Sequence, residues 1–381
     1  MALSHAFPSG QPVPPQQKAL TVLGLESSCD DTAAAVLRRA PDGSVTVLAE
    51  RVLGQDAAHA PYGGVVPEIA ARAHAERMDG LAAEVLAEAG LSAHELDGVA
   101  ATAGPGLIGG VMAALMTAKG LALGAGIALV AVNHLEGHAL SPRLTRKLDF
   151  PYLLLLVSGG HTQLVIVEGV GAMTRLGSTI DDAAGEAFDK TAKIMGLGFP
   201  GGPAVERAAR AARNPERFDL PRMLTGKPGC DFSFAGLKTA ARRAWDALEA
   251  PGDQDRADLA GAVQSAIASH LSERTGRAMD RFIEAFPQAS RTLVAAGGVA
   301  ANQTVRAALT EAAQARGFEL IAPPLKYCTD NAAMIALAGA ERLALGLVDG
   351  LDAPARARWP LDADAAARDP ATGGGRKGPK A

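Results

Sequence analysis

Two histidines four residues apart are the side chains in this sequence best spaced to do chemistry together. His134 and His138 follow an apolar run, residues 127–132, which predicts a buried strand. On a helix, side chains four residues apart lie on one face, and two imidazoles at that spacing can share one metal ion. Asn133 can cap such a helix, and Glu136 can reach back to the N–H of the cap. The segment therefore predicts a short capped helix that holds either a metal ion or two structural histidines.

A metalloprotease of the zincin type would need a different arrangement of these residues. In that motif the catalytic glutamate directly follows the first histidine, whereas here Leu135 follows His134. Glu136 lies about 200° around the helix from His134, so it points away from any ion shared by the histidines. The spacing therefore disfavours a protease.

Length and charge limit the classes of protein that fit. The chain has 381 residues, enough for two domains, and 48% of them are hydrophobic, so a large core is expected. The net charge is -4, so a nucleic acid would have to meet a local basic patch. The best candidate patch is a run of five arginines: Arg207, Arg210, Arg213, Arg217 and Arg222.

Cysteine usage and the apolar segments indicate a reducing compartment and no membrane. The three cysteines, Cys29, Cys230 and Cys328, are odd in number and widely spaced, so neither a disulfide framework nor a zinc knuckle is implied. No uninterrupted apolar run reaches membrane-spanning length. Residues 1–18 lack the basic-then-apolar pattern of a signal peptide and predict a loose tail.

A strand, a polar loop and a second strand occur twice along the chain. The first set has apolar runs at residues 20–25 and 33–37, and the second at 152–157 and 163–167. Each set leads a mixed α/β segment, so we expect an internal duplication. Both loops are rich in hydroxyls or glycines, which can hold phosphate oxygens, whereas the carboxylates of the first loop would need a cation in between.

Further strands and helices are predicted from periodicity and end signals. Short strands are expected at residues 98–102, 292–296 and 320–323. Helices are expected at residues 68–89, 107–124, 181–195, 203 onward, 303–317 and 331–345, and residues 258–286 are expected to form one or two long helices. Residues after about 360 are rich in Asp and Ala and then in Gly, Lys and Pro, so they are expected to be disordered.

Some polar residues of these elements have ordinary structural interpretations. His74 lies in the helix 68–89 without an obvious partner, which favours a structural histidine. Asp189 and Lys193 form a stabilising pair on the helix 181–195, as expected for a solvated face. Asp330 stands beside the start of the last helix, where aspartate often serves as a cap.

Six motifs occur in order along the chain: Gly24–Thr32, Gly63–Glu68, His134-x-x-x-His138, Val157–Thr162, Phe188–Lys190 with Pro200–Pro203, and Gly297–Val299 with Asn302. Together, from about Leu20 to Leu345, they resemble the TsaD family of bacterial tRNA N6-adenosine threonylcarbamoyltransferases. Ala235 and Ala300 stand where serine is common in the family, and Gly177-Ser178-Thr179 stands where Gly-Glu-Ser is frequent.

The resemblance implies an α/β fold of the actin, sugar kinase and Hsp70-like (ASKHA) type. That fold has two lobes built from duplicated RNase H-like domains around a central cleft, which agrees with the duplicated strand–loop–strand sets. We expect a disordered tail at 1–19, an N-terminal lobe at 20–133, a C-terminal lobe at 134–345 with most of the nucleotide and metal site, and a mostly disordered tail at 346–381.

The resemblance also implies a reaction. The family transfers the threonylcarbamoyl group of threonylcarbamoyl-AMP to N6 of adenosine 37 in tRNAs that read codons beginning with A. The metal ligands match His134, His138 and Asp330, with Fe²⁺ as the expected ion and Zn²⁺ as the alternative. The substrate-binding positions match Leu156, Val157, Ser158, Gly159, Gly160, Asp189, Gly202 and Asn302.

Further expectations concern proton transfer, partners and rival activities. Asp30 and Asp31 are candidates for proton handling. The expected partners are tRNA, a TsaB-like paralogue and a TsaE-like ATPase in the cytoplasm, with a homodimer as an option for the chain alone. The alternatives are an actin-like ATPase or kinase and, behind it, a metalloprotease. A non-catalytic scaffold akin to the paralogue would lack the three candidate metal ligands.

Overall fold

The computed structural model describes residues 18–62 and 64–368, and contacts divide them into two compact units. Unit 1 comprises the described residues up to Lys147 together with Asp330–Trp359, and unit 2 comprises Leu148–Thr329 with the described residues from Pro360. This division differs from the expected boundary between residues 133 and 134. The segment with both histidines and the helix after Asp330 belong to unit 1, not to a C-terminal lobe.

Unit 1 is built on a five-stranded mixed sheet with the strand order β3-β2-β1-β4-β5. The strands are β1 (Leu20–Glu26), β2 (Thr32–Arg39), β3 (Val45–Leu53), β4 (Gly98–Gly104) and β5 (Ala128–Asn133). The first three form an antiparallel meander, whereas β4 runs parallel to β1 and β5 parallel to β4. The carboxyl ends of β1, β4 and β5 therefore meet at one edge of the sheet.

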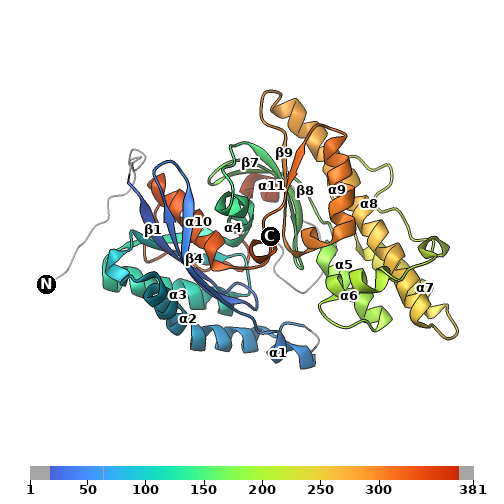
Figure 1. The fold of residues 1–381 in the computed structure, drawn as a ribbon, viewed down its shortest axis with the longest axis horizontal. Helices are drawn as coiled ribbons and strands as arrows, with labels where there is room; N and C mark the ends of the chain where they lie inside the picture. The colour runs from blue at the N-terminus through green and yellow to red at the C-terminus, as the bar shows by residue number, and fades with distance from the viewer. Residues whose placement is uncertain (1–17, 63, 369–381) are drawn as a thin grey trace. The chain divides into compact units, whose positions relative to one another are not determined.

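Helices cover both faces of this sheet. They are α1 (Asp56–His59), α2 (Pro67–Ala89), α3 (Ile108–Ala125), α4 (His134–Leu140) and α10 (Ala332–Ala344). Helices α2 and α3 pack side by side on one face, and α10 crosses the other (Figure 1). Helix α3 has the length and hydropathy of a membrane span, but it packs against β4 and α2 within unit 1.

Gly24 sets how closely α10 approaches β1. A Cβ atom at Gly24 would lie 2.4 Å from the carbonyl oxygen of Ala332 and 2.5 Å from the backbone nitrogen of Ala336. Contacts that short are prohibitive, so only glycine permits this packing. Because Asp330 lies two residues before α10 begins, the same close approach brings Asp330 to the end of β1.

Unit 2 repeats the topology of unit 1. Its strand order is β10-β9-β6-β7-β8, with β6, β7 and β8 antiparallel, β9 parallel to β6 and β10 parallel to β9. The strands are β6 (Tyr152–Val157), β7 (Thr162–Gly169), β8 (Ala172–Ser178), β9 (Thr292–Ala296) and β10 (Glu319–Ile321). The predicted internal duplication and the α/β actin-like fold class are confirmed.

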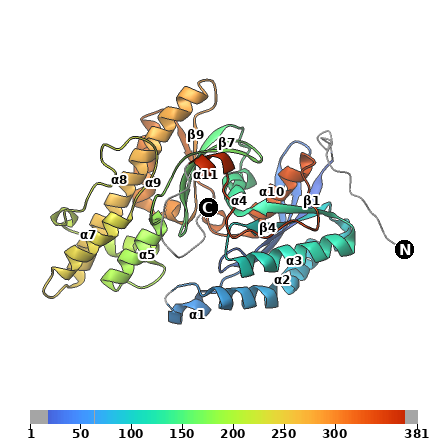
Figure 2. The ribbon, with the colours of Figure 1, turned by 180° about the vertical axis from the view of Figure 1, so that it is seen from behind.

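The helices of unit 2 lie mainly between β8 and β9 in sequence. They are α5 (Ala184–Met195), α6 (Gly201–Ala209), α7 (Ala235–Asp246), α8 (Asp253–Ala285), α9 (Gln303–Gln314) and α11 (Ala363–Arg368). Figure 2 shows α8 and α9 alongside β9. Their inner faces build one hydrophobic core with β6 and β7, around Leu155, Phe188, Val263 and Leu309.

Several elements were not predicted from the sequence. The strands β3 and β8 and the helix α7 have no counterpart among the expected elements, and α8 is one continuous helix that begins at Asp253. The prediction of a mostly disordered tail from residue 346 is wrong for residues 346–368. Trp359 accepts a hydrogen bond from Asn133, and residues 363–368 are helical. Residues 1–17 and 369–381, for which tails were predicted, lie outside the described residues.

Candidate functional site

Three side chains from two distant segments of unit 1 converge on one point. His138 Nε2 lies 3.2 Å from His134 Nε2 and 3.1 Å from Asp330 Oδ1. His134 Nε2 lies 3.5 Å from the same carboxylate oxygen. Both imidazoles are buried, and the carboxylate of Asp330 is partly exposed. The histidines are on α4, as predicted, and Asp330 directly precedes the N-cap of α10.

The geometry of the triad fits a single divalent ion. A triangle with these sides has its centre about 1.9 Å from each corner, close to the metal–nitrogen and metal–oxygen bond lengths of roughly 2.0–2.2 Å. Two imidazoles and one carboxylate leave further coordination positions open, as catalytic metal sites require. These three residues are the one group of His, Cys, Asp or Glu in the described part of the chain that comes together in this way.

Glu26 orients His134 toward that point. The Nδ1–H group of His134 donates to Oε2 of Glu26 over 2.9 Å, which leaves the lone pair of Nε2 facing Asp330 and His138. The carboxylate of Glu26 is fully buried and also accepts from the backbone N–H of Ser28 and the hydroxyl of Thr102. A carboxylate behind a ligating histidine is the usual outer support of a metal site.

The charges of these groups are strongly coupled. Burial opposes the charged form of His134, but the carboxylates of Glu26 and Asp330 raise its pKa well above the usual value. Burial likewise opposes ionisation of Asp330, yet His134 and His138 lower the pKa of Asp330 well below its usual value. Two carboxylates at this spot therefore require a compensating cation, either a proton on His134 or a metal ion.

The short helix α4 is held in place at both ends. The side chain of Asn133 accepts from the N–H of Leu135 over 2.9 Å, so the predicted cap is confirmed. Glu136 lies 3.1 Å from Arg342 on α10, which ties the two ligand-bearing segments together. The carboxylate of Glu136 is thus directed away from the triad, as expected from the helix geometry. Asn331 rather than Asp330 caps α10, so Asp330 is free of that structural role.

Asp30 and Asp31 lie in the turn that links β1 to β2, next to the triad. In the same turn, the hydroxyl of Ser28 is 3.2 Å from Nδ1 of His134. The pKa of Cys29 is raised well above its usual value, first by burial and then by the charges of Asp30 and Asp330. The turn therefore contacts the candidate metal centre through Ser28, and burial disfavours the thiolate form of Cys29.

His74 has the structural role expected of it. It is fully buried, and its Nδ1 lies 2.8 Å from the hydroxyl of Thr32, while its Nε2 faces the carbonyl oxygen of Cys29 over 3.2 Å. Through these two contacts, His74 holds the β1–β2 turn in place.

In unit 2, the predicted substrate-binding residues gather where β6 and β9 end. Leu156 and Val157 are the last residues of β6 and are fully buried, so their side chains are core. The loop Ser158–Gly160 follows, and Gly159 and Gly160 are exposed with open space beside their Cα atoms. Gly297, after β9, packs so closely that a Cβ there would lie 2.3 Å from the carbonyl oxygen of Val157.

Asp189 and Gly202 lie on the neighbouring helices α5 and α6. Oδ1 of Asp189 accepts from the N–H of Gly201 over 2.7 Å, which holds the start of α6 against α5. Burial raises the pKa of Asp189, and the N–H of Gly201 partly offsets this. The ion pair predicted between Asp189 and Lys193 does not form among the described residues. At Gly202 the space beside the Cα atom is open.

The side chain of Asn302 makes two structural hydrogen bonds. Its Oδ1 accepts from the N–H of Val305 over 3.0 Å and caps α9, and its Nδ2 donates to Gln264 over 2.8 Å. It is 6% exposed. The amide of Asn302 thus caps α9 and links it to α8.

Glu26 and Thr102 are the residues that the sequence interpretation missed. Glu26 ends an otherwise apolar strand, and a carboxylate in that position was the available signal. The local sequence around Thr102 does not predict its hydrogen bond to Glu26, because the two residues lie 76 positions apart on neighbouring strands.

Comparisons with known proteins agree with this architecture. The model of the family TsaD, tRNA N6-adenosine threonylcarbamoyltransferase, matches residues 46–337. A protein of that name from Maricaulis maris (strain MCS10) is 74% identical over 368 residues, which cover 96% of this chain and 97% of the relative. One from Caulobacter vibrioides is 60% identical over 367 residues, with coverages of 96% and 99%.

Solved structures with little sequence identity share the fold. Full-length HypF in the phosphate- and nucleotide-bound form matches with a TM-score of 0.55 at 11% identity, over 88% of this chain and 57% of that one. HypF of T. kodakarensis matches with a TM-score of 0.52 at 14% identity, over 88% and 49%. Together with the family match and the two close relatives, the duplicated fold leads to one conclusion: the chain belongs to the tRNA N6-adenosine threonylcarbamoyltransferase family, TsaD.

Proposed function

We propose that this chain transfers the threonylcarbamoyl group of threonylcarbamoyl-AMP to N6 of adenosine 37 in tRNAs that read codons beginning with A. Its membership of the TsaD family supports a tRNA-modifying transferase of the acyltransferase class. The single observation that carries the proposal is the convergence of His134, His138 and Asp330. The three residues that match the family's metal ligands lie close enough together to share one ion.

The triad would hold one divalent ion, Fe²⁺ in the first instance and Zn²⁺ as the alternative, since both accept imidazole and carboxylate ligands. When bound, such an ion would polarise the oxygens of the carbamoyl–phosphate mixed anhydride and favour departure of the phosphate. Glu26 keeps the proton of His134 on Nδ1, so Nε2 stays available as a ligand.

The residues of unit 2 would hold the adenylate. The backbone of Gly159 and Gly160 and the hydroxyl of Ser158 offer donors to its phosphate, in a loop open enough for close approach. Leu156 and Val157 position that loop, and the start of α6 at Gly202 is fixed by Asp189. Asn302 would act through the backbone of the helix that it caps.

In the transfer, the N6 amine attacks the carbamoyl carbon, the new N–C bond forms, and the bond from that carbon to the phosphate oxygen breaks, releasing AMP. The amine is a poor nucleophile and must be held in line with the carbonyl. The proton that leaves N6 needs an acceptor, and we assign Asp30 or Asp31 to this role because their turn touches His134 through Ser28.

The partners follow from the reaction. A tRNA would meet the arginine-bearing stretch 207–222, and a TsaB-like paralogue and a TsaE-like ATPase would assist turnover in the cytoplasm. In the absence of partners, the chain would be free to form a homodimer.

The decisive experiment measures transfer from labelled threonylcarbamoyl-AMP to unmodified tRNA, with and without the two partner proteins. The wild-type chain should label tRNA at one adenosine, and His138→Ala should not. The matched control is His94→Ala, which removes an exposed histidine of unit 1. Phosphate release from ATP without tRNA would instead point to an actin-like ATPase, and chelator-sensitive cleavage of a glycoprotein to a protease.

A further inference from the structure

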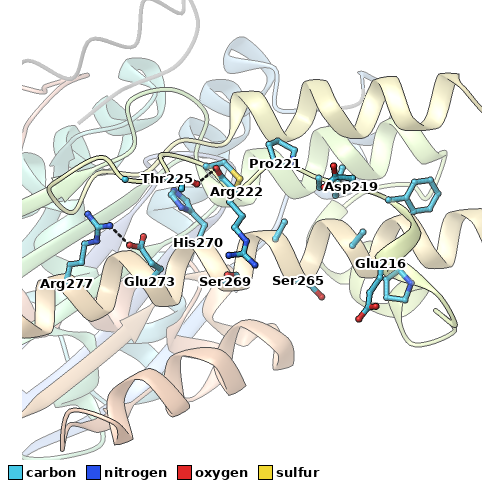
Figure 3. Close-up of a pocket in the computed structure, with 17 residues that line it drawn as sticks. Glu216, Asp219, Pro221, Arg222, Thr225, Ser265, Ser269, His270, Glu273 and Arg277 are labelled. Carbon is cyan, nitrogen blue, oxygen red and sulfur yellow. Dashed lines mark hydrogen bonds and ion pairs between the residues drawn. The ribbon is translucent and has the colours of Figure 1, made fainter.

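A cavity in unit 2 is lined by none of the residues assigned to the adenylate. It has a volume of about 740 Å³ and lies, open on one side, between the segment 215–226 and the helix α8 (Figure 3). Its apolar wall is formed by half-buried side chains that pack on the core, Phe218 and Met223 among them. The volume is typical of sites that enclose a small organic group.

One buried polar side chain, His270, lines this cavity and uses one of its two ring nitrogens in a hydrogen bond among the described residues. His270 is 5% exposed, and its Nε2 accepts the N–H of Ser233 over 3.2 Å. Burial, with Arg274 nearby, lowers the pKa of His270 to about 4, so the ring is neutral and its proton is on Nδ1. Within residues 18–62 and 64–368, nothing accepts from that Nδ1–H group. The Nδ1–H group is therefore a donor that a ligand in the cavity can use.

Charged side chains line the cavity along its length. Figure 3 shows Arg222 reaching across the cavity toward Ser269, and its guanidinium has no partner among the described residues. Arg277, beyond His270, is already paired with Glu273 over 2.6 Å. At the opposite end, Glu216 and Asp219 present two carboxylates. Between the paired Glu273 on one side and the two carboxylates on the other, the cavity thus offers a cationic donor at Arg222 and a hydroxyl donor at Ser269.

We propose that this cavity takes one unpaired nucleotide of the tRNA substrate, with its phosphate at Arg222 and Ser269. The base would lie along the apolar wall, its amino edge would donate to the carboxylates of Glu216 or Asp219, and an acceptor on the nucleotide would receive the Nδ1–H group of His270. A cavity of about 740 Å³ is too small for a duplex and admits a base only when the base is turned out of its stack. This inference rests on the proposed function for the identity of the RNA.

The first test compares the tRNA affinity of full-length variants. Arg222→Gln should raise the Kd for unmodified tRNA about 3–10-fold and lower the slope of log Kd against log salt by about 0.7, because one phosphate contact is lost. Ser269→Trp should raise the Kd by a similar factor and leave the slope unchanged, because it fills the cavity without changing the charge. The matched control is Arg281→Gln, which removes an exposed charge from the same helix outside the cavity.

The second test identifies what occupies the cavity. Ser269→Cys carrying a photo-cross-linker should cross-link tRNA at unpaired nucleotides, well above the level of Arg281→Cys. The inference is overturned by cross-links only to duplex stems, only to a partner protein or only to free nucleotides, and equally by wild-type affinity in both cavity variants. Failure of the proposed function is separate: it would appear as a wild-type chain that neither binds nor modifies tRNA.

Discussion

His138 Nε2 lies 3.1 Å from Asp330 Oδ1, although 192 residues separate the two in the chain. This contact closes the candidate metal centre, and it exists because β1, α4 and α10 meet at one edge of the sheet of unit 1. Its consequences can be measured on metal binding and on the stability of unit 1.

Loss of either partner of this contact should abolish metal binding. Asp330→Asn keeps the shape of the side chain but removes the charge, and His138→Ala removes a ligand. Each should lower the affinity for Fe²⁺ or Zn²⁺ by at least about 100-fold, and transfer activity should fall with it. Metal content after gel filtration and competition with a chelating dye measure the effect. Full metal content in both variants would refute the site.

Glu26 should raise the metal affinity of the site without being a metal ligand itself. In Glu26→Gln the carboxylate that accepts from Nδ1 of His134 loses its charge, so the imidazole becomes a poorer ligand. We expect the metal affinity to fall about 10–100-fold. The control is Glu88→Gln, which changes an exposed carboxylate of α2. Equal affinities of Glu26→Gln and the wild type would show that His134 needs no support.

The packing of α10 on β1 should depend on Gly24. A methyl group there meets backbone atoms of Ala332 and Ala336, so Gly24→Ala should lower the free energy of unfolding by about 1–3 kcal/mol and displace Asp330. Gly120→Ala is the matched control, because Gly120 lies inside the helix α3 with open space beside it. That change should raise stability by about 0.5–1 kcal/mol. Urea unfolding of the wild type and the two variants measures these changes. An equal loss of stability in both variants would contradict this explanation.

The buried His270 should make unit 2 acid-sensitive. Its pKa of about 4 in the folded chain lies below the unfolded value of roughly 6.5, so the unfolded state binds more protons between these values. Stability is therefore fully present above pH 6.5 and is lost as the pH falls toward 4, by at most about 3 kcal/mol. His270→Gln keeps an acceptor for Ser233 and should flatten this slope. A slope as steep as that of the wild type would exclude His270 as its source, and His94→Gln controls for loss of an exposed histidine.

Short-range signals in the sequence predicted much of the fold. The alternation of apolar runs with polar loops predicted both strand–loop–strand sets, and the duplication followed from their similarity. The cap at Asn133 and the spacing of His134 and His138 predicted the helix α4 and its common face. These features depend on neighbours within a few residues, which is why periodicity and end signals suffice for them. The strands β3 and β8 were not predicted because their exposed residues break the apolar pattern.

The sequence by itself determined that two imidazoles share one helical face and that the chain repeats one α/β unit. Only the tertiary structure decided that Asp330 meets them, that Glu26 supports His134, and that α4 and α10 belong to the same unit. The physical reason is that these contacts join residues more than 100 positions apart. Their closeness comes from strand order and from the close packing that Gly24 permits, neither of which leaves a periodic trace in the local sequence.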